Sequence, residues 1–152
     1  MDPVAITAAM SEATFAEVIT SSSRQLREIL FSQMNIKLKK KNLGLHVHEK
    51  RDERIRKLHE KLKQASGKRE TDICCELVRT WLYSKRAMLK SALDFLGVPN
   101  EDGLVDTEID FFKELSLERV RELKAHLCKN FSPEHVKIYM QFVEIPHTND
   151  ID

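Results

Sequence analysis

The residues most able to do chemistry lie between positions 37 and 63, in the segment KLKKKNLGLHVHEKRDERIRKLHEKLK. The segment carries eleven lysines and arginines against four acidic residues, and it contains His46, His48 and His59. Its cations could neutralise nucleic-acid phosphates, and its imidazoles could bind a metal ion. Both kinds of side chain could also lie on the solvated side of a helix, so the elements that hold them decide between these interpretations.

The three histidines lack the spacing of a metal site. A helical zinc site places two ligands one turn apart, as in His-x-x-x-His, and takes a third ligand from elsewhere. His48 and Asp52 have this spacing, and His59 lies two turns beyond Asp52 on the same face. The chain has no His-Glu-x-x-His, however, and Cys74-Cys75 has no second cysteine pair. We therefore predict solvated histidines, no metal and no cofactor.

The acidic stretch NEDGLVD at 100–106 matches a calcium-binding loop only in part. With Gly103 at the sixth position of an EF-hand loop, the first and twelfth positions are Val98 and Ile109. Neither residue supplies a carboxylate, so we interpret the stretch as an acidic turn that serves as a linker.

Nucleophilic catalysis has little support in the sequence. Cys128 has His126 and His135 near it along the chain, but it also fits an apolar helical stripe, where a buried thiol is inert. The sequence contains no Gly-rich phosphate loop and no Gly-x-Ser-x-Gly. We predict no catalytic residues and a protein that is not an enzyme. Three cysteines, two of them adjacent, form no disulfide framework, which favours a cytoplasmic location.

The scarcity of glycine and proline predicts long helices. The chain has only four of each in 152 residues, too few for the turns of a many-stranded sheet protein. The broadest apolar stripe of helical spacing runs through residues 70–96, and Gly97 and Pro99 follow it in the order that ends a helix. We predict an all-α single domain, residues 1–152, in which five or six helices pack around one long central helix at about residues 70–96.

Capping residues predict where the other helices begin. Asp2-Pro3 is a helix start, and Ser22 with Gln25 fits a capping box that would divide the first apolar pattern. The apolar spacing continues across these serines, so one uninterrupted helix fits equally well. Ser116 and Ser132-Pro133 predict the starts of the last two helices, and residues 147–152 are expected to form a frayed tail.

The lysine run at 39–41 has the position of a helix end, because Gly44 follows it and cations favour the carboxyl end of a helix. A short hairpin is the alternative, since both neighbouring runs alternate between apolar and polar residues. It would pair Ile36 and Leu38 with Leu45 and Val47.

Residues 48–65 predict a charged helix with one narrow apolar stripe, formed by Ile55, Leu58, Leu62 and Ala65. Such a stripe is typical of a coiled-coil seam, so residues 45–66 could form a projecting helical arm. Ile55, Leu58 and Leu62 would then dock against another chain. The arm could equally fold back on its own helices.

Two function classes follow. The first is a non-enzymatic protein-interaction or regulatory module that binds an unidentified protein partner or itself. Residues 37–63 have a net charge of +7 and residues 97–152 a net charge of −6, so two copies could dock as a homodimer. No apolar run is long enough to cross a membrane, and we expect no membrane partner.

The second class is a nucleic-acid-binding protein that uses the basic segment 37–63 on phosphates. Interspersed acids and the absence of aromatic residues in the segment weaken this alternative. The cations it would use are Lys37, Lys39, Lys40, Lys41, Lys50, Arg51, Arg54 and Arg56.

Overall fold

A computed structural model describes residues 2–34, 47–65, 67–106 and 111–151. Within these residues the protein has eight helices and no strand, which confirms the all-α prediction. The number of helices is larger than the five or six that we expected. Its contacts divide the chain into two compact units, an N-terminal unit (Asp2–Trp81) and a C-terminal unit (Leu82–Asp152), and each is described by itself. The single domain stays a prediction.

Three short helices open the N-terminal unit: α1 (Pro3–Ala9), α2 (Glu12–Ser21) and α3 (Arg24–Gln33). Each begins at a side chain that accepts a backbone N–H, as capping requires. Asp2 accepts from Val4, as the Asp2-Pro3 pattern predicts. The serine break also exists, but its cap is Ser23, one residue after the predicted Ser22.

The prediction that the lysine run at 39–41 lies at a helix end is not tested, because residues 35–46 lie outside the described residues. α3 ends at Gln33, before that run. The hairpin alternative falls in the same gap except for Val47, which is helical.

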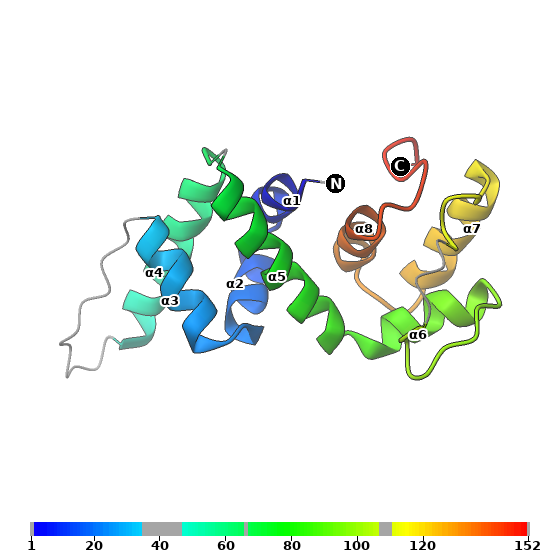
Figure 1. Ribbon diagram of the computed structural model, residues 1–152, viewed down its shortest axis with the longest axis horizontal. Coiled ribbons are helices and arrows are strands. Elements are labelled where there is room, and N and C mark those ends of the chain that lie inside the picture. Colours follow the sequence, from blue (N-terminus) through cyan, green and yellow to red (C-terminus); the bar gives the residue numbers. More distant parts are fainter. Residues whose placement is uncertain (1, 35–46, 66, 107–110, 152) are drawn as a thin grey trace. The chain divides into compact units, whose positions relative to one another are not determined.

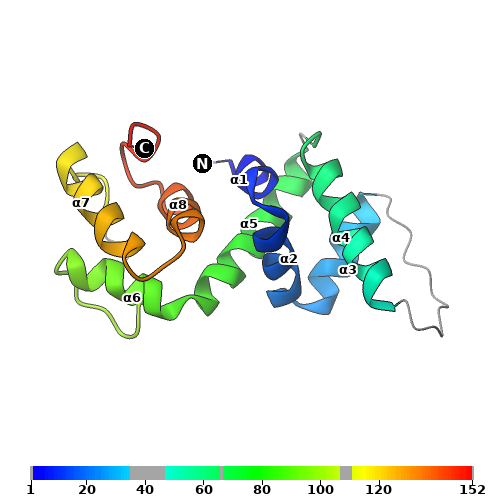
Figure 2. The ribbon, with the colours of Figure 1, turned by 180° about the vertical axis from the view of Figure 1, so that it is seen from behind.

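The fourth helix, α4 (Val47–Leu62), lies close to the predicted bounds of 48–65. It packs against α1 and α2, which stand beside it in Figure 2. α5 (Lys68–Ser84) follows and carries its own apolar face into this unit. The fully buried side chains of the unit include Phe15, Val18, Leu30, Leu58, Cys74, Leu77, Val78 and Trp81.

The long central helix predicted at 70–96 is divided in two. α5 ends at Ser84 and α6 (Arg86–Phe95) begins after Lys85, whose φ and ψ of −96° and 43° leave the helical region. Lys85 stands three and four residues after Leu82 and Trp81, where an unbroken stripe needs its next apolar residue. A continuous helix would therefore direct an ammonium group into the buried face, and breaking the helix avoids this cost.

In the C-terminal unit α6 packs against α7 (Leu117–Cys128), and α7 packs against α8 (Pro133–Phe142) (Figure 1). Both starts are as predicted, since Ser116 accepts the N–H of Arg119 and Pro133 is the first residue of α8. Burial raises the pKa of the Tyr139 hydroxyl on α8. The buried side chains include Met88, Ala92, Val120, Leu123, Leu127, Val136, Tyr139 and Met140.

Residues 147–151, which we expected to fray, fold back on this unit. Lys124 of α7 donates from Nζ to the carbonyl of Ile151 at 3.0 Å, and the Ile151 side chain is buried. Thr148 donates to the carbonyl of Ile145 at 2.6 Å. The single apolar residue in an otherwise polar tail provides the anchor, which a composition-based prediction overlooks.

The end of α6 and the following turn form one rigid feature. Gly97 has φ +73°, and the bonds from Gly97 N to Asp94 O and from Val98 N to Leu93 O complete a Schellman motif. Asp102 and Gly103 then take φ values of +50° and +83° in a tight turn that pairs the flanking residues.

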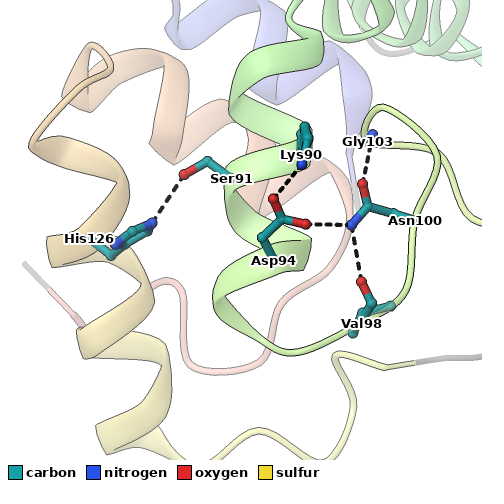
Figure 3. A network of polar contacts seen from close by, with 7 residues as sticks. All are labelled: Lys90, Ser91, Asp94, Val98, Asn100, Gly103 and His126. Carbon is teal, nitrogen blue, oxygen red and sulfur yellow. Dashed lines mark hydrogen bonds and ion pairs between the residues drawn. The ribbon is translucent and has the colours of Figure 1, made fainter.

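Polar side chains hold this turn against α6 (Figure 3). The Asn100 amide donates to Asp94 at 2.8 Å, and its oxygen accepts the N–H of Gly103 at 2.9 Å. Hydrogen bonds from Lys90 and then from Asn100 lower the pKa of the Asp94 carboxyl. The stretch thus contains a turn, as predicted, and side chains hold it against α6.

We predict that Gly103→Ala destabilises the protein more than Gly97→Ala. Both positions have positive φ, which costs an alanine about 1 kcal/mol. At Gly103 a Cβ would also lie 2.8 Å from Leu89 Cβ and 2.8 Å from Lys90 N, whereas at Gly97 nothing lies within 4 Å. Crowding of this kind adds about 1–3 kcal/mol. Urea unfolding of both variants measures the difference, and equal losses would contradict the packing described here.

Candidate functional site

The predicted interaction stripe on α4 is part of the core of the N-terminal unit. Ile55, Leu58 and Leu62 are 6%, 0% and 1% exposed, because α4 lies against α1 and α2. The arm therefore folds back on its own helices, the alternative that the sequence left open. These three side chains do not form a surface that another chain could contact.

His59 completes the buried face of α4, which corrects the expectation of a solvated histidine. Its ring stacks on Phe15 with centroids 4.3 Å apart, and its Nε2 lies 3.2 Å from the carbonyl of Thr7 at the end of α1. The side chain is 2% exposed. A ring with one polar contact serves here as packing, and among the described residues no group of His, Cys, Asp and Glu could hold a metal. His46 and the side chain of His48 lie outside them.

The predicted phosphate-binding residues are only partly placed. Lys37, Lys39, Lys40 and Lys41 lie outside the described residues, and Lys50 is placed only as a backbone position in α4. Arg51 is exposed, Arg54 is half-buried, and Arg56 lies 3.8 Å from Glu12. The nucleic-acid interpretation stays a prediction.

The neighbouring cations of α4 pair within their own helix. Lys57 and Lys63 lie 3.2 and 3.1 Å from Glu53 and Glu60. Such exposed pairs contribute little stability, but they place a carboxylate beside each ammonium. This part of α4 therefore presents mixed charge rather than a continuous cationic face.

Ser91 and His126 form the contact that most resembles a catalytic pair (Figure 3). The Ser91 hydroxyl lies 3.0 Å from His126 Nε2, the distance of a nucleophile from its base. The His126 ring stacks on the Phe95 ring with centroids 4.6 Å apart. The Arg119 guanidinium carbon lies 4.4 Å from the centroid of the Phe95 ring, and Arg119 also donates to the Phe95 carbonyl. The sequence did not predict this cluster, in which the residues that contact one another across α6 and α7 are 24 to 35 positions apart.

This cluster joins α6 to α7 and does not form a catalytic centre. Ser91 lies inside α6, where backbone N–H groups are used by the helix and cannot build an oxyanion hole. His126, which we weighed as a base for Cys128, is engaged with Ser91 and Phe95 instead. Within the described chain we find no third group that orients the imidazole.

The most distinctive exposed cluster is formed by Tyr83, Arg86 and Leu104, and we call it the interaction surface. Tyr83 and Leu104 are 51% and 39% exposed, which is unusual for large apolar side chains. Arg86 at the start of α6 lies over the Tyr83 ring at 5.7 Å. Leu104 follows Gly103, whose close approach to the Arg86 carbonyl places the turn against this end of α6.

Arg86 has a buried hydrogen-bond donor that is unsatisfied. Its Nη1 is buried and has no hydrogen-bond partner among the residues that the structure describes. A guanidinium N–H removed from water without an acceptor costs free energy, more than a neutral group would. Sequence reasoning missed this residue because nothing in its spacing distinguishes it from other surface arginines.

Comparisons of the chain with protein-family models, with curated proteins and with solved structures found no match. None of the helices in the described ranges has the length and hydropathy to span a bilayer.

We predict that His59→Ala lowers the free energy of unfolding by about 2–4 kcal/mol, because it removes the stack on Phe15 and leaves a cavity under α4. His147→Ala is the matched control. His147 is 44% exposed beside Asp150, so its removal should change stability by less than about 0.5 kcal/mol. Chemical denaturation measures both, and similar losses would contradict the burial of His59.

The three thiols should differ in reactivity. Burial raises the pKa of Cys74 from 9.0 to about 11, whereas Cys75 and Cys128 are partly exposed. We expect a maleimide at neutral pH to label Cys75 and Cys128 in the native protein and all three thiols after unfolding. Mass spectrometry locates the labels.

The raised pKa of Cys74 also predicts a pH dependence of stability. Between pH 9.0 and about 11 the thiol ionises in the unfolded chain but not in the folded one, so the free energy of unfolding measured by denaturation should fall as the pH rises through this range.

Proposed function

We propose that this chain is a non-enzymatic helical protein-interaction module, and that Tyr83, Arg86 and Leu104 are the surface with which it binds a partner. The proposal rests on two large apolar side chains that are exposed, Tyr83 and Leu104, and on the half-buried Arg86, whose guanidinium lies over the Tyr83 ring. A bound partner would cover both apolar side chains and place an acceptor against the part of the Arg86 side chain that remains exposed.

The residue types support this assignment. Tyrosine and arginine are the side chains that most often dominate binding energy at protein interfaces, and they do so when water is excluded around them. The Arg86 guanidinium is already half withdrawn from water and is oriented by the Tyr83 ring. Little conformational entropy remains to be lost when an acceptor arrives.

The chemistry of the surface defines the partner. A planar guanidinium selects a carboxylate, and Tyr83 with Leu104 selects an apolar side chain beside it. We therefore propose a protein segment that presents Asp or Glu next to an apolar residue. A second copy of this chain is one source of such a segment, since residues 97–152 hold twelve acidic residues.

Selection from a displayed random-peptide library tests this proposal, with the full chain as the immobilised target. We expect the selected peptides to share an acidic residue adjacent to an apolar one. Measured by fluorescence anisotropy, Tyr83→Ala and Arg86→Met should each weaken their binding roughly tenfold or more. Arg121→Met, which removes an exposed arginine of α7, is the matched control and should leave binding unchanged.

Arg86→Met also separates function from stability. Because the Nη1 atom has no partner to lose, this substitution should leave the free energy of unfolding within about 1 kcal/mol of the wild type while it reduces binding. Sedimentation velocity across a wide concentration range identifies whether the partner is a second copy. Selected peptides that bind both variants as tightly as the wild type would overturn the proposal.

A further inference from the structure

A second feature of the C-terminal unit lies between α7, α8 and the returning tail. Here a cavity of about 350 Å³ is lined by Lys124, Lys137, Met140, Thr148, Asn149 and Ile151. Figure 1 shows the tail, in red, turning back beside α8. The volume falls within the range of small-molecule sites, roughly 300–1,000 Å³. None of these residues belongs to the interaction surface.

The polar groups around this cavity are mainly hydrogen-bond donors. Lys124 uses one N–H on the Ile151 carbonyl and keeps two. Asn149 accepts a bond from Gln141 through Oδ1, which leaves its amide N–H groups to donate. Lys137 is exposed on α8 and forms no ion pair within the described chain.

The lining has an unusual charge for its surroundings. Residues 97–152 have a net charge of −6, yet the described residues that line the cavity include two lysines and no carboxylate. The positive potential at this point is therefore not neutralised from within the lining and favours an anion. Met140 and Ile151, both largely buried, supply the apolar part of the lining, which we call the apolar floor.

We infer that this cavity is a binding site for a carboxylate carried on a short apolar body. Lys137 and Asn149 donate to the carboxylate, Lys124 adds a second charge, and the apolar body lies on Met140 and Ile151. A free medium-chain carboxylic acid and the C-terminus of a peptide with an apolar last residue share this chemistry. Inorganic phosphate has the charge but no group for the apolar floor.

The test is a titration of the full chain followed by NMR, with the methyl groups of Met140 and Ile151 as reporters. The probes are octanoate, an acetylated peptide ending in Val-Leu with a free carboxylate, the same peptide amidated, and inorganic phosphate. We expect saturable shifts with octanoate or the free peptide, whichever of the two sources fits, and none with the amide or phosphate.

Lys137→Met should weaken the affinity for the bound probe roughly fivefold, the effect of losing one partly solvated ion pair. Lys129→Met removes an exposed lysine at the end of α7 that does not line the cavity, and it should leave the affinity unchanged. The inference is overturned if neither carboxylate gives saturable shifts, if the amide binds equally well, or if both lysine variants have the same effect.

Discussion

The core of the N-terminal unit depends on the packing of α4, a strongly charged helix, against its neighbours. Among the described side chains of α4, the apolar residues on its inner face are Ile55, Leu58 and Leu62, and these alone would make a thin seam. His59 widens the seam, because its ring stacks flat on Phe15 while its nitrogen reaches the last turn of α1. The charged residues then remain on the outer side, where Lys57 and Lys63 find carboxylates one turn away. One histidine thus allows a helix of predominantly solvent-facing composition to complete the core of this unit.

Local sequence signals predicted most of the helix starts. The break at Lys85 and the position of the C-terminal tail depend on tertiary contacts, which these signals do not contain. Asp2, Ser116 and Pro133 begin helices because their effect acts within one turn and needs no tertiary partner. The break at Lys85 was missed because it has no glycine, proline or capping side chain. It arises from a charged residue at a position of the apolar stripe, which becomes costly only when that face is buried. The tail was missed for the converse reason, since one buried isoleucine and one lysine from α7 are enough to hold it.

The candidate sites were less predictable than the fold, and the reason is physical. The Ile55, Leu58 and Leu62 stripe was recognised as apolar, but a one-dimensional pattern does not say whether an apolar face meets its own chain or another. Tyr83, Arg86 and Leu104 come from two helices and a turn, and the close approach of Gly103 to the Arg86 carbonyl brings that turn to the start of α6. Residues 37–41 fall outside the described chain, so the structure does not test the phosphate-binding hypothesis for these residues.

Both proposed sites share one energetic argument. A folded chain normally satisfies its buried donors and neutralises its charges, and stability selects against exceptions. The acidic C-terminal unit pairs Lys90 with Asp94 and Arg119 with Glu122, so carboxylate partners are available to its cations. Among the described residues of that unit, Arg86 Nη1 has no hydrogen-bond partner and Lys137 forms no ion pair. Both cations therefore keep a positive charge that a carboxylate from outside the chain can neutralise. The two cations lie on different elements, and so they define two independent sites.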